Sequence, residues 1–271
     1  MAAIDYESEY NNRARVPEHP QIIAEWEADA AAYRAVAIED GRAELGISYG
    51  PTARQTIDLL APKEGGATPL AMFIHGGYWR SLEASTFSHM ARGLNGHGIT
   101  VAVVDYDLCP RVRIADIINE MRRACLYLWR RFGRKVTVYG HSAGGHLTAC
   151  MLATDWKEVA TDAPSDLVPA ACAFSGLFDL WPMTQVAMNA DFGLDEASAR
   201  QISPLFWPAP AGRIFDTVVG GEESSEYLRQ SRTITKQWGG AGVTTHCNVV
   251  NGKNHFTIIK ALSEPDSAVV K

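Results

Sequence analysis

One serine of the chain stands in a setting that favours nucleophilic chemistry. Ser142 is the centre of Gly140-His-Ser-Ala-Gly144, which follows the apolar run 136–139 and precedes the helical stretch 146–153. In a strand–turn–helix context, a G-x-S-x-G sequence forms a sharp turn that leaves the serine hydroxyl exposed. The N-terminus of the following helix favours negative charge beside it. We therefore expect Ser142 to be a nucleophile rather than part of a glycine–serine turn without chemistry.

A second glycine motif ends an earlier apolar run. His75-Gly-Gly-Tyr-Trp79 follows residues 70–74, which we predict to be a strand. A loop of this H-G-G type can turn its backbone N–H groups toward the oxyanion formed during acyl transfer, together with the N–H of the residue after the nucleophile. The predicted donors are Gly77, Tyr78 and Ala143, and Gly76 is expected to shape the loop.

A serine nucleophile needs a base, and in this arrangement the acid and then the histidine follow the serine in the chain. His246 and His255 are the histidines beyond Ser142 and its own helix. His246 lies in the alternating run 244–250 and reads as a strand side chain. His255 lies in a loop after that strand, where an imidazole can reach the serine. His255 is therefore the predicted base.

The acid is less well determined by spacing. Glu222 and Glu223 directly follow the predicted strand 217–219, Asp179 follows the strand 170–174, and Asp216 lies too early. Neighbouring carboxylates at a helix start often only cap the helix. Spacing alone therefore divides the role between Glu222 and Glu223, with a smaller share for Asp179.

Other candidate residues carry weaker signals. His141 and His146 flank the serine without a carboxylate at metal-ligand spacing, so we expect no metal and no cofactor. The aromatic residues Trp79, Trp207 and Phe256 are predicted to contact the substrate. For the aromatic residues of the segment around Trp207, plain packing is an equal alternative.

The elements that must position these residues alternate between strand and helix. Such alternation predicts an α/β fold, with a mostly parallel sheet, helices on both faces and ligands beyond the carboxyl ends of the strands. Strands are predicted over 55–60, 70–74, 99–104, 135–139, 170–174, 217–219 and 244–250, and helices over 22–37, 114–128, 146–153, 222–238 and 256–262.

The chain of 271 residues is predicted to form one domain, 1–271. Residues of about 1–45 form an N-terminal extension, in which apolar side chains from Ile22 to Ala37 recur at helical spacing and must be buried against the rest. Residues of about 180–212 are the candidate cap segment. Gly65-Gly66 and Gly239-Gly240 are predicted to be turns rather than domain linkers.

The charge and composition of the chain limit the classes of molecule that it is expected to bind. The net charge of −6 and a pI near 5.8 argue against nucleic acid and anionic membranes. Because the N-terminus is acidic and no apolar run approaches a membrane span, neither a signal peptide nor a membrane anchor is expected. The five cysteines are widely spaced, as in proteins with reduced thiols. We expect a cytoplasmic protein with a small-molecule substrate, and a homodimer remains open.

Several motifs along the chain together point to one family: His75–Trp79, Tyr106–Pro110, Gly140–Leu147, Ser175–Leu180, Val219–Tyr227 and Asn254–Ile259. By these motifs the chain resembles the arylformamidases, also called kynurenine formamidases, of the esterase/lipase branch of the α/β hydrolases. Tyr10–Arg13, Val16-Pro17 and Trp26 are similar to bacterial members. The resemblance implies the α/β-hydrolase fold, and it places the acid on Glu223, where animal members carry Asp immediately before the serine.

The resemblance also implies a function. The expected enzyme is a serine hydrolase in which Ser142 attacks a carbonyl, His255 transfers the proton and Glu223 holds His255. By resemblance, the substrate is an N-formyl aryl amine such as N-formylkynurenine. The alternatives are a general carboxylesterase for short-chain or aryl esters and, in another class, a non-catalytic ligand-binding protein of the same fold. The last would have lost a triad residue, and none is missing.

Overall fold

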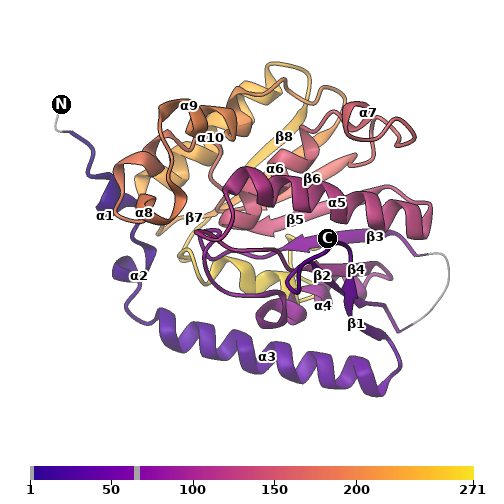
Figure 1. The fold of residues 1–271 in the computed structure, drawn as a ribbon. Helices are drawn as coiled ribbons and strands as arrows, with labels where there is room; N and C mark the ends of the chain where they lie inside the picture. The colour runs from indigo at the N-terminus through magenta and orange to yellow at the C-terminus, as the bar shows by residue number, and fades with distance from the viewer. Residues whose placement is uncertain (1–2, 64–67) are drawn as a thin grey trace.

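A computed structural model describes residues 3–63 and 68–271 of the protein (Figure 1). Its centre is an eight-stranded sheet with the order β1-β2-β4-β3-β5-β6-β7-β8. The pairs β1–β2 and β2–β4 are antiparallel, and every later pair is parallel. The strands are β1 (Ala43–Ser48), β2 (Thr56–Leu60), β3 (Leu70–Ile74), β4 (Thr100–Val104), β5 (Val136–His141), β6 (Ala170–Phe174), β7 (Ile214–Gly220) and β8 (Thr244–Val250).

The central strands are buried on both faces, which explains why they read as continuous apolar runs. In β3, Leu70, Met72 and Ile74 pack into one hydrophobic core. Ala71 and Phe73 point the other way and pack into a second core. Successive side chains of a strand face opposite sides, so one short run serves both layers.

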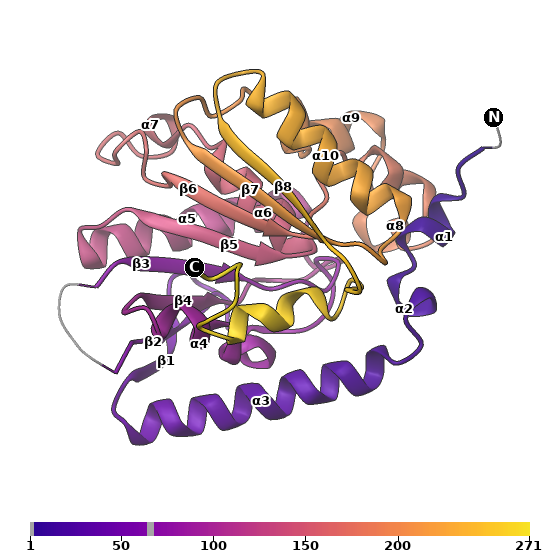
Figure 2. The ribbon, with the colours of Figure 1, turned by 180° about the vertical axis from the view of Figure 1, so that it is seen from behind.

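Helices cover the two faces (Figures 1 and 2). The first core is closed by α5 (Ile114–Phe132), α6 (Ala143–Leu152) and α10 (Ser225–Gly239). The second is closed by α3 (His19–Glu39), the 3₁₀ segment η1 (Ala84–Ala91) and the 3₁₀ segment η4 (Ile258–Ser263). The predicted fold class, with a mostly parallel sheet between two helical layers, is confirmed.

The N-terminal extension contains α1 (Tyr6–Tyr10), α2 (Asn12–Arg15) and α3. As its spacing predicted, α3 buries Trp26, Ala30 and Ala37. The Trp26 ring packs on Phe87 of η1, with ring centroids 5.4 Å apart. The helix α3 is therefore packed on the helical layer that covers one face of the sheet. The helices α1 and α2, which precede α3, lie near the carboxyl ends of the strands (Figure 1).

Several predicted boundaries were wrong. β7 begins three residues before the predicted 217, and α10 begins at Ser225 because residues 221–224 form the turn after β7. The helix predicted over 256–262 is a 3₁₀ helix and begins two residues later, at Ile258. β1 was not predicted because it is a largely exposed edge strand without an apolar stripe. Gly65 and Gly66 lie outside the described residues, whereas Gly239 and Gly240 end α10.

Short helical segments follow β6: η2 (Trp181–Gln185), α8 (Asn189–Phe192), α9 (Glu196–Gln201) and η3 (Pro204–Phe206). They contact α1, since the ring of Tyr6 packs edge-on against Trp181 and Glu7 accepts a hydrogen bond from the Ala187 N–H. The remaining helices are α4 (Arg92–Asn95) and α7 (Trp156–Val159). Within the described part of the chain, no helix is both long and apolar enough to cross a membrane.

Candidate active site

Ser142 stands at the sharp turn between β5 and α6. Its backbone has φ 56° and ψ −117°, a strained conformation for a residue with a side chain. The flanking glycines allow this turn, because a Cβ on Gly140 would lie 2.5 Å from the Gly144 oxygen, and one on Gly144 would lie 2.0 Å from the Ile74 oxygen. The motif therefore has a steric requirement for both glycines, and it presents the serine at the N-terminus of α6.

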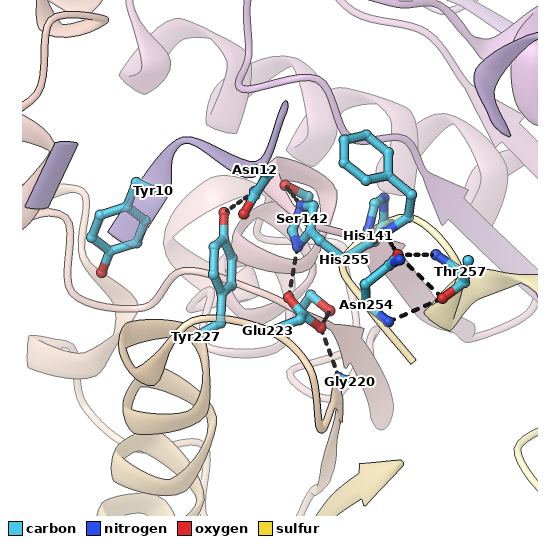
Figure 3. A network of polar contacts seen from close by, with 12 residues as sticks. Tyr10, Asn12, His141, Ser142, Gly220, Glu223, Tyr227, Asn254, His255 and Thr257 are labelled. Atoms are coloured by element: carbon cyan, nitrogen blue, oxygen red, sulfur yellow. Dashed lines mark hydrogen bonds and ion pairs between the residues drawn. The ribbon is translucent and has the colours of Figure 1, made fainter. Parts of the chain in front are cut away.

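Three residues predicted from the sequence meet in one hydrogen-bonded chain (Figure 3). The His255 Nε2 lies 3.0 Å from the Ser142 Oγ, and the His255 Nδ1 lies 2.7 Å from the Glu223 Oε2. An ionised carboxylate only accepts, so Nδ1 carries the proton and Nε2 is free to accept the serine proton. All three residues are buried. The arrangement can therefore raise the nucleophilicity of a serine hydroxyl.

The loops after β7 and β8 bring the acid and the base together. Gly220 ends β7, and a Cβ there would lie 2.2 Å from the Lys253 oxygen, so the two loops approach closely. The Asn254 Oδ1 accepts the N–H groups of Phe256 and Thr257, at 3.0 and 2.9 Å. This local turn carries His255 between them and points its ring toward Ser142 (Figure 3).

The second oxygen of Glu223 is held as firmly as the first. Its Oε1 accepts the Gly220 N–H at 2.7 Å and the Ser175 hydroxyl at 2.5 Å. Ser175 follows β6 with φ 51° and is completely buried. Sequence reasoning gave Ser175 no role, although it lies in one of the motifs that carried the family resemblance.

The structure separates Glu223 from the competing residues. Glu222 is exposed, and Asp179 lies 3.8 Å from Arg229. His246 is an exposed strand residue paired with Asp216. Of the two glutamates between which spacing divided the role, Glu223 is the one whose carboxylate contacts His255, because the turn after Gly220 directs only this side chain inward.

The H-G-G loop passes directly beside the serine. A Cβ on Gly76 would lie 3.1 Å from the Ser142 Cβ, and one on Gly77 would lie 2.2 Å from the Ser81 oxygen. Gly77, Tyr78 and Trp79 all have positive φ, at 110°, 50° and 54°. This unusual run turns the loop across the site, so that Gly77 and Tyr78 line the same cavity as Ser142.

The buried side chain of His75 holds this loop in place through contacts of both ring nitrogens. Its Nε2 lies 3.0 Å from the Asp105 Oδ1, and its Nδ1 lies 2.7 Å from the Gly76 oxygen. The ring stacks on Tyr106 with centroids 4.2 Å apart, and the Tyr106 hydroxyl donates to the His75 carbonyl. The histidine of the motif therefore supports the glycines and lies outside the hydrogen-bonded chain of Ser142.

A cavity of about 340 Å³ opens onto the serine. Its walls come from the loops at the carboxyl ends of the strands and from the N-terminal extension, which contributes residues of all three of its helices. The lining residues are Glu7, Tyr10, Asn11, Asn12, Arg13, Ile23, Trp26, Gly77, Tyr78, Arg80, Ser81, Leu82, His141, Ser142, Met188, His255 and Phe256.

Of the aromatic residues predicted to contact the substrate, Phe256 lines this cavity. The prediction for Trp79 was wrong: its side chain is completely buried and packs edge-on against His146 and Phe192. For Trp207 the structure shows the plain packing that the sequence left as an equal alternative, because its ring packs under the Arg122 guanidinium and its indole N–H donates to the Gln201 oxygen. Aromatic type and nearness in sequence did not reveal which way these side chains point.

Burial also sets the protonation of groups around the serine. It lowers the pKa of His141 well below its usual value, and the neighbouring His255 lowers it further. Because a carbonyl oxygen only accepts, the His141 Nε2 is the donor in its 2.8 Å hydrogen bond to the His255 carbonyl. Burial raises the pKa of Tyr78 and of Tyr227, so both phenols keep their protons. Over residues 3–63 and 68–271 no cluster of histidine, cysteine or acidic side chains is suited to a metal ion.

A mostly parallel sheet with a serine on the turn between a central strand and its helix defines the α/β hydrolases, and the chain is one of them. A family model described as BD-FAE matches residues 57–203, which is more than half of the chain. The protein therefore belongs to the BD-FAE family. Its relatives make it an arylformamidase-like member, as the motifs predicted.

The curated relatives are enzymes of two kinds. A kynurenine formamidase of Danio rerio is 26% identical over 84% of this chain and 79% of its own length. One of Drosophila melanogaster is 28% identical over 82% and 78%. An isoprenylcysteine α-carbonyl methylesterase of Arabidopsis thaliana is 29% identical over 77% and 55%. All are hydrolases, so the chain is a hydrolase.

Solved structures agree with this fold. A putative thioesterase from Silicibacter sp. TM1040 has a TM-score of 0.87 and 32% identity, and the match covers 99% of this chain and 98% of that one. Esterase B from Lactobacillus rhamnosus has a TM-score of 0.68 at 18% identity, covering 94% and 92%. The second likeness supports the fold alone.

Proposed function

We propose that the protein is a serine hydrolase that cleaves a small aryl formamide, such as N-formylkynurenine, through an acyl-enzyme. The observation that carries the proposal is the hydrogen-bonded chain from Ser142 through His255 to Glu223. A nucleophile, a base and a group that orients the base are the parts this chemistry requires. Ser142 and His255 both line a cavity, so a substrate carbonyl can approach the serine.

In the proposed mechanism the Ser142 Oγ attacks the formyl carbon while its proton passes to the His255 Nε2. The negative charge on the tetrahedral oxygen is stabilised by the N–H groups of Gly77, Tyr78 and Ala143. His255 then gives its proton to the aryl nitrogen as the C–N bond breaks, and the aryl amine leaves. Water then attacks the formyl carbon of the acyl-enzyme while His255 takes its proton, and His255 returns that proton to the Ser142 Oγ as the ester bond breaks and formate leaves.

Glu223 has a positional and an electrostatic task in this cycle. It keeps the His255 proton on Nδ1, so that Nε2 is free to act as the base, and it stabilises the imidazolium formed after attack. Its second oxygen is already saturated by Gly220 and Ser175. A glutamate held at both oxygens can therefore replace the aspartate that animal relatives carry.

The size of the cavity supports a compact substrate. Sites for small molecules usually enclose about 300–1,000 Å³, and this one lies at the lower end, at about 340 Å³. Apolar and aromatic side chains such as Ile23, Trp26 and Phe256 line it, which suits an aryl group. The formamide itself is inferred from the kynurenine formamidase relatives.

The second candidate is a carboxylesterase for short-chain or aryl esters. Two comparisons favour it: the methylesterase relative and the putative thioesterase, which shares 32% identity over nearly the whole chain. The same groups would perform this reaction, with a C–O bond breaking in place of the C–N bond. The two substrates differ mainly in the basicity of the leaving group.

The deciding experiment compares turnover of N-formylkynurenine with turnover of a panel of short-chain aryl esters, with Ser142→Ala as the control. Formate and the free amine or alcohol are measured as products. Efficient release of kynurenine, well above the best ester, supports the arylformamidase. Ester turnover with negligible deformylation selects the carboxylesterase. If neither is cleaved and Ser142 does not react with a fluorophosphonate probe, the serine hydrolase is rejected in favour of a ligand-binding protein.

A further inference from the structure

The N-terminal extension places one polar side chain between two working parts of the site. Asn12 of α2 is buried at 5% exposure. It lies 66 residues before Tyr78 of the H-G-G loop and 215 residues before Tyr227 of α10, yet it contacts both. Figure 3 shows Asn12 and Tyr227 joined beside Ser142 and His255.

The contacts form a closed triangle of hydrogen bonds. The Asn12 Nδ2 donates to the Tyr227 hydroxyl at 2.9 Å and to the Tyr78 hydroxyl at 3.1 Å. The two hydroxyls lie 2.7 Å apart. The Tyr78 hydroxyl also donates to the Tyr10 carbonyl at 2.6 Å. The side chains of Asn12, Tyr78 and Tyr227 come from segments that are distant in sequence, and the Tyr10 carbonyl lies two residues before Asn12.

Counting the protons fixes the direction of every bond. A phenol has one proton, and the Tyr10 carbonyl can only accept, so the Tyr78 proton is used there. The contact between the hydroxyls must then be donated by Tyr227. The two protons of the Asn12 amide supply one bond to each phenol. Every donor of the triangle is then satisfied, and the two hydrogens of the single Asn12 amide nitrogen are each used by a different phenol.

Each phenol belongs to a residue that touches the proposed reaction. The Tyr78 N–H is a proposed oxyanion donor, and its backbone has the strained φ of 50°. A residue in such a conformation persists only when its surroundings hold it. The Tyr227 ring packs against the His255 imidazole with centroids 4.6 Å apart. The triangle therefore links the oxyanion loop to the base.

We propose that Asn12 is a positioning residue for catalysis: it holds Tyr78 and Tyr227, and through them sets the oxyanion loop against the imidazole. This inference rests on the proposed serine hydrolase. It also gives the N-terminal extension a catalytic purpose beyond closing the cavity. Its effect is expected on kcat, because the oxyanion forms only in the transition state.

Asn95 of α4 provides a matched control. It is a similarly buried asparagine, with 8% exposure. Its amide nitrogen also donates twice, to the carbonyls of Leu60 and Ile99, at 2.8 Å each. Leu60 ends β2 and Ile99 directly precedes β4, and neither residue lines the cavity of Ser142. Asn95→Ala therefore reports the cost of losing a buried amide network without a change at the candidate site.

The test is a double-mutant cycle with Asn12→Ala, Tyr78→Phe and the double variant, measured with the substrate that the wild-type protein turns over best. We expect Asn12→Ala to lower kcat by about 10- to 100-fold with KM changed less than about threefold. Tyr78→Phe should have a similar effect. The double variant should be little worse than either single variant, because residues that act through one network are not additive. Asn95→Ala should lower the melting temperature and leave kcat at the wild-type value.

Two results overturn the inference. One is an Asn12→Ala variant with wild-type kcat and only a lower melting temperature. The other is a double variant whose loss equals the product of the two single losses. If Asn12→Ala does not fold, Asn12→Asp keeps the volume and removes both donors, and it is judged by the same criteria. Failure of the proposed function is recognised separately, because the wild-type protein would then turn over no substrate in a Ser142-dependent way.

Discussion

Two histidine–carboxylate pairs connect the β7 and β8 segments, and of these two only the pair of His255 and Glu223 faces Ser142. In the first pair, the His255 Nδ1 lies 2.7 Å from the Glu223 Oε2, and the exposed fractions of the two side chains are 6% and 0%. In the second pair, the His246 Nδ1 lies 2.9 Å from the Asp216 Oδ1, and the exposed fractions are 74% and 39%. Both acids come from β7 or its end, and both histidines come from β8 or its end.

The difference lies in the position along the strands. Asp216 and His246 are register partners within the β7–β8 pair, so their side chains meet on the flank of the sheet, in water. Glu223 and His255 lie beyond the strand ends, where the loops converge on Ser142. An exposed pair contributes little, whereas a buried and oriented pair can move a proton. The role that we propose for the buried pair follows from its place at the strand ends, because the two pairs have similar chemical composition.

The largest expected difference between the two pairs comes from replacing the buried histidine. His255→Gln should lower kcat by about 10⁴- to 10⁶-fold, because the serine loses its base while the oxyanion donors remain. Turnover of the best substrate, with circular dichroism as the folding control, measures this. Activity within tenfold of wild type would place the base elsewhere.

Removing the charge of the acid should cost less than removing the base. Glu223→Gln keeps the shape of the side chain but can donate to Nδ1, which favours the wrong tautomer of His255. We expect a fall in kcat of about 10³- to 10⁴-fold. The matched control is Glu222→Gln, the exposed neighbour, which should keep wild-type activity. Equal losses in the two variants would contradict the assignment of Glu223.

Buried histidines should also make the protein sensitive to acid. Burial lowers the pKa of His89 and of His146 to about 4, against about 6.5 in the unfolded chain. The unfolded state therefore binds protons first, so the free energy of unfolding is highest above pH 6.5 and falls as the pH decreases toward 4. Between pH 7 and pH 5 each histidine should remove about 2 kcal/mol.

Urea unfolding at several pH values measures this slope. His146→Gln can keep a hydrogen bond to the Ile202 carbonyl, which His146 makes at 2.7 Å, and should reduce the loss between pH 7 and pH 5 by about 2 kcal/mol. An unchanged slope in this variant would show that His146 does not couple folding to protons.

A smaller effect is expected from the group behind the acid. Ser175→Ala removes one of the two donors to the Glu223 Oε1 and leaves the Gly220 N–H in place. We expect kcat to fall by about tenfold, with KM unchanged, because the carboxylate is held less firmly. A change in melting temperature without a change in kcat would give Ser175 a structural role only.

The exposed pair should contribute almost nothing. His246→Gln is expected to keep kcat and KM within about twofold of wild type and to change the free energy of unfolding by less than about 0.5 kcal/mol. Kinetics beside urea unfolding of the same preparation test both values. A loss of activity comparable to that of His255→Gln would remove the distinction between the two pairs.

The sequence by itself determined the parts that depend on local sterics and chain order. The glycines around Ser142 and the H-G-G loop are local requirements for a tight turn, and apolar runs predict buried strands wherever they occur. His255 could be selected over His246 because a loop residue and an alternating strand residue have different patterns. A mostly parallel sheet with helices on both faces followed from the alternation of strand-like and helix-like segments, whereas the order of the strands within the sheet came only from the structure.

Only the tertiary structure decided which side chains meet. Glu222 and Glu223 are adjacent and chemically alike, and the turn after β7 selects between them. Trp79 points into the core and packs against His146, whereas its place in the motif had suggested a contact with the substrate. Asn12 and Ser175 reach partners 215 and 48 residues away. Such contacts arise when distant segments pack together, and no local pattern of residues records them.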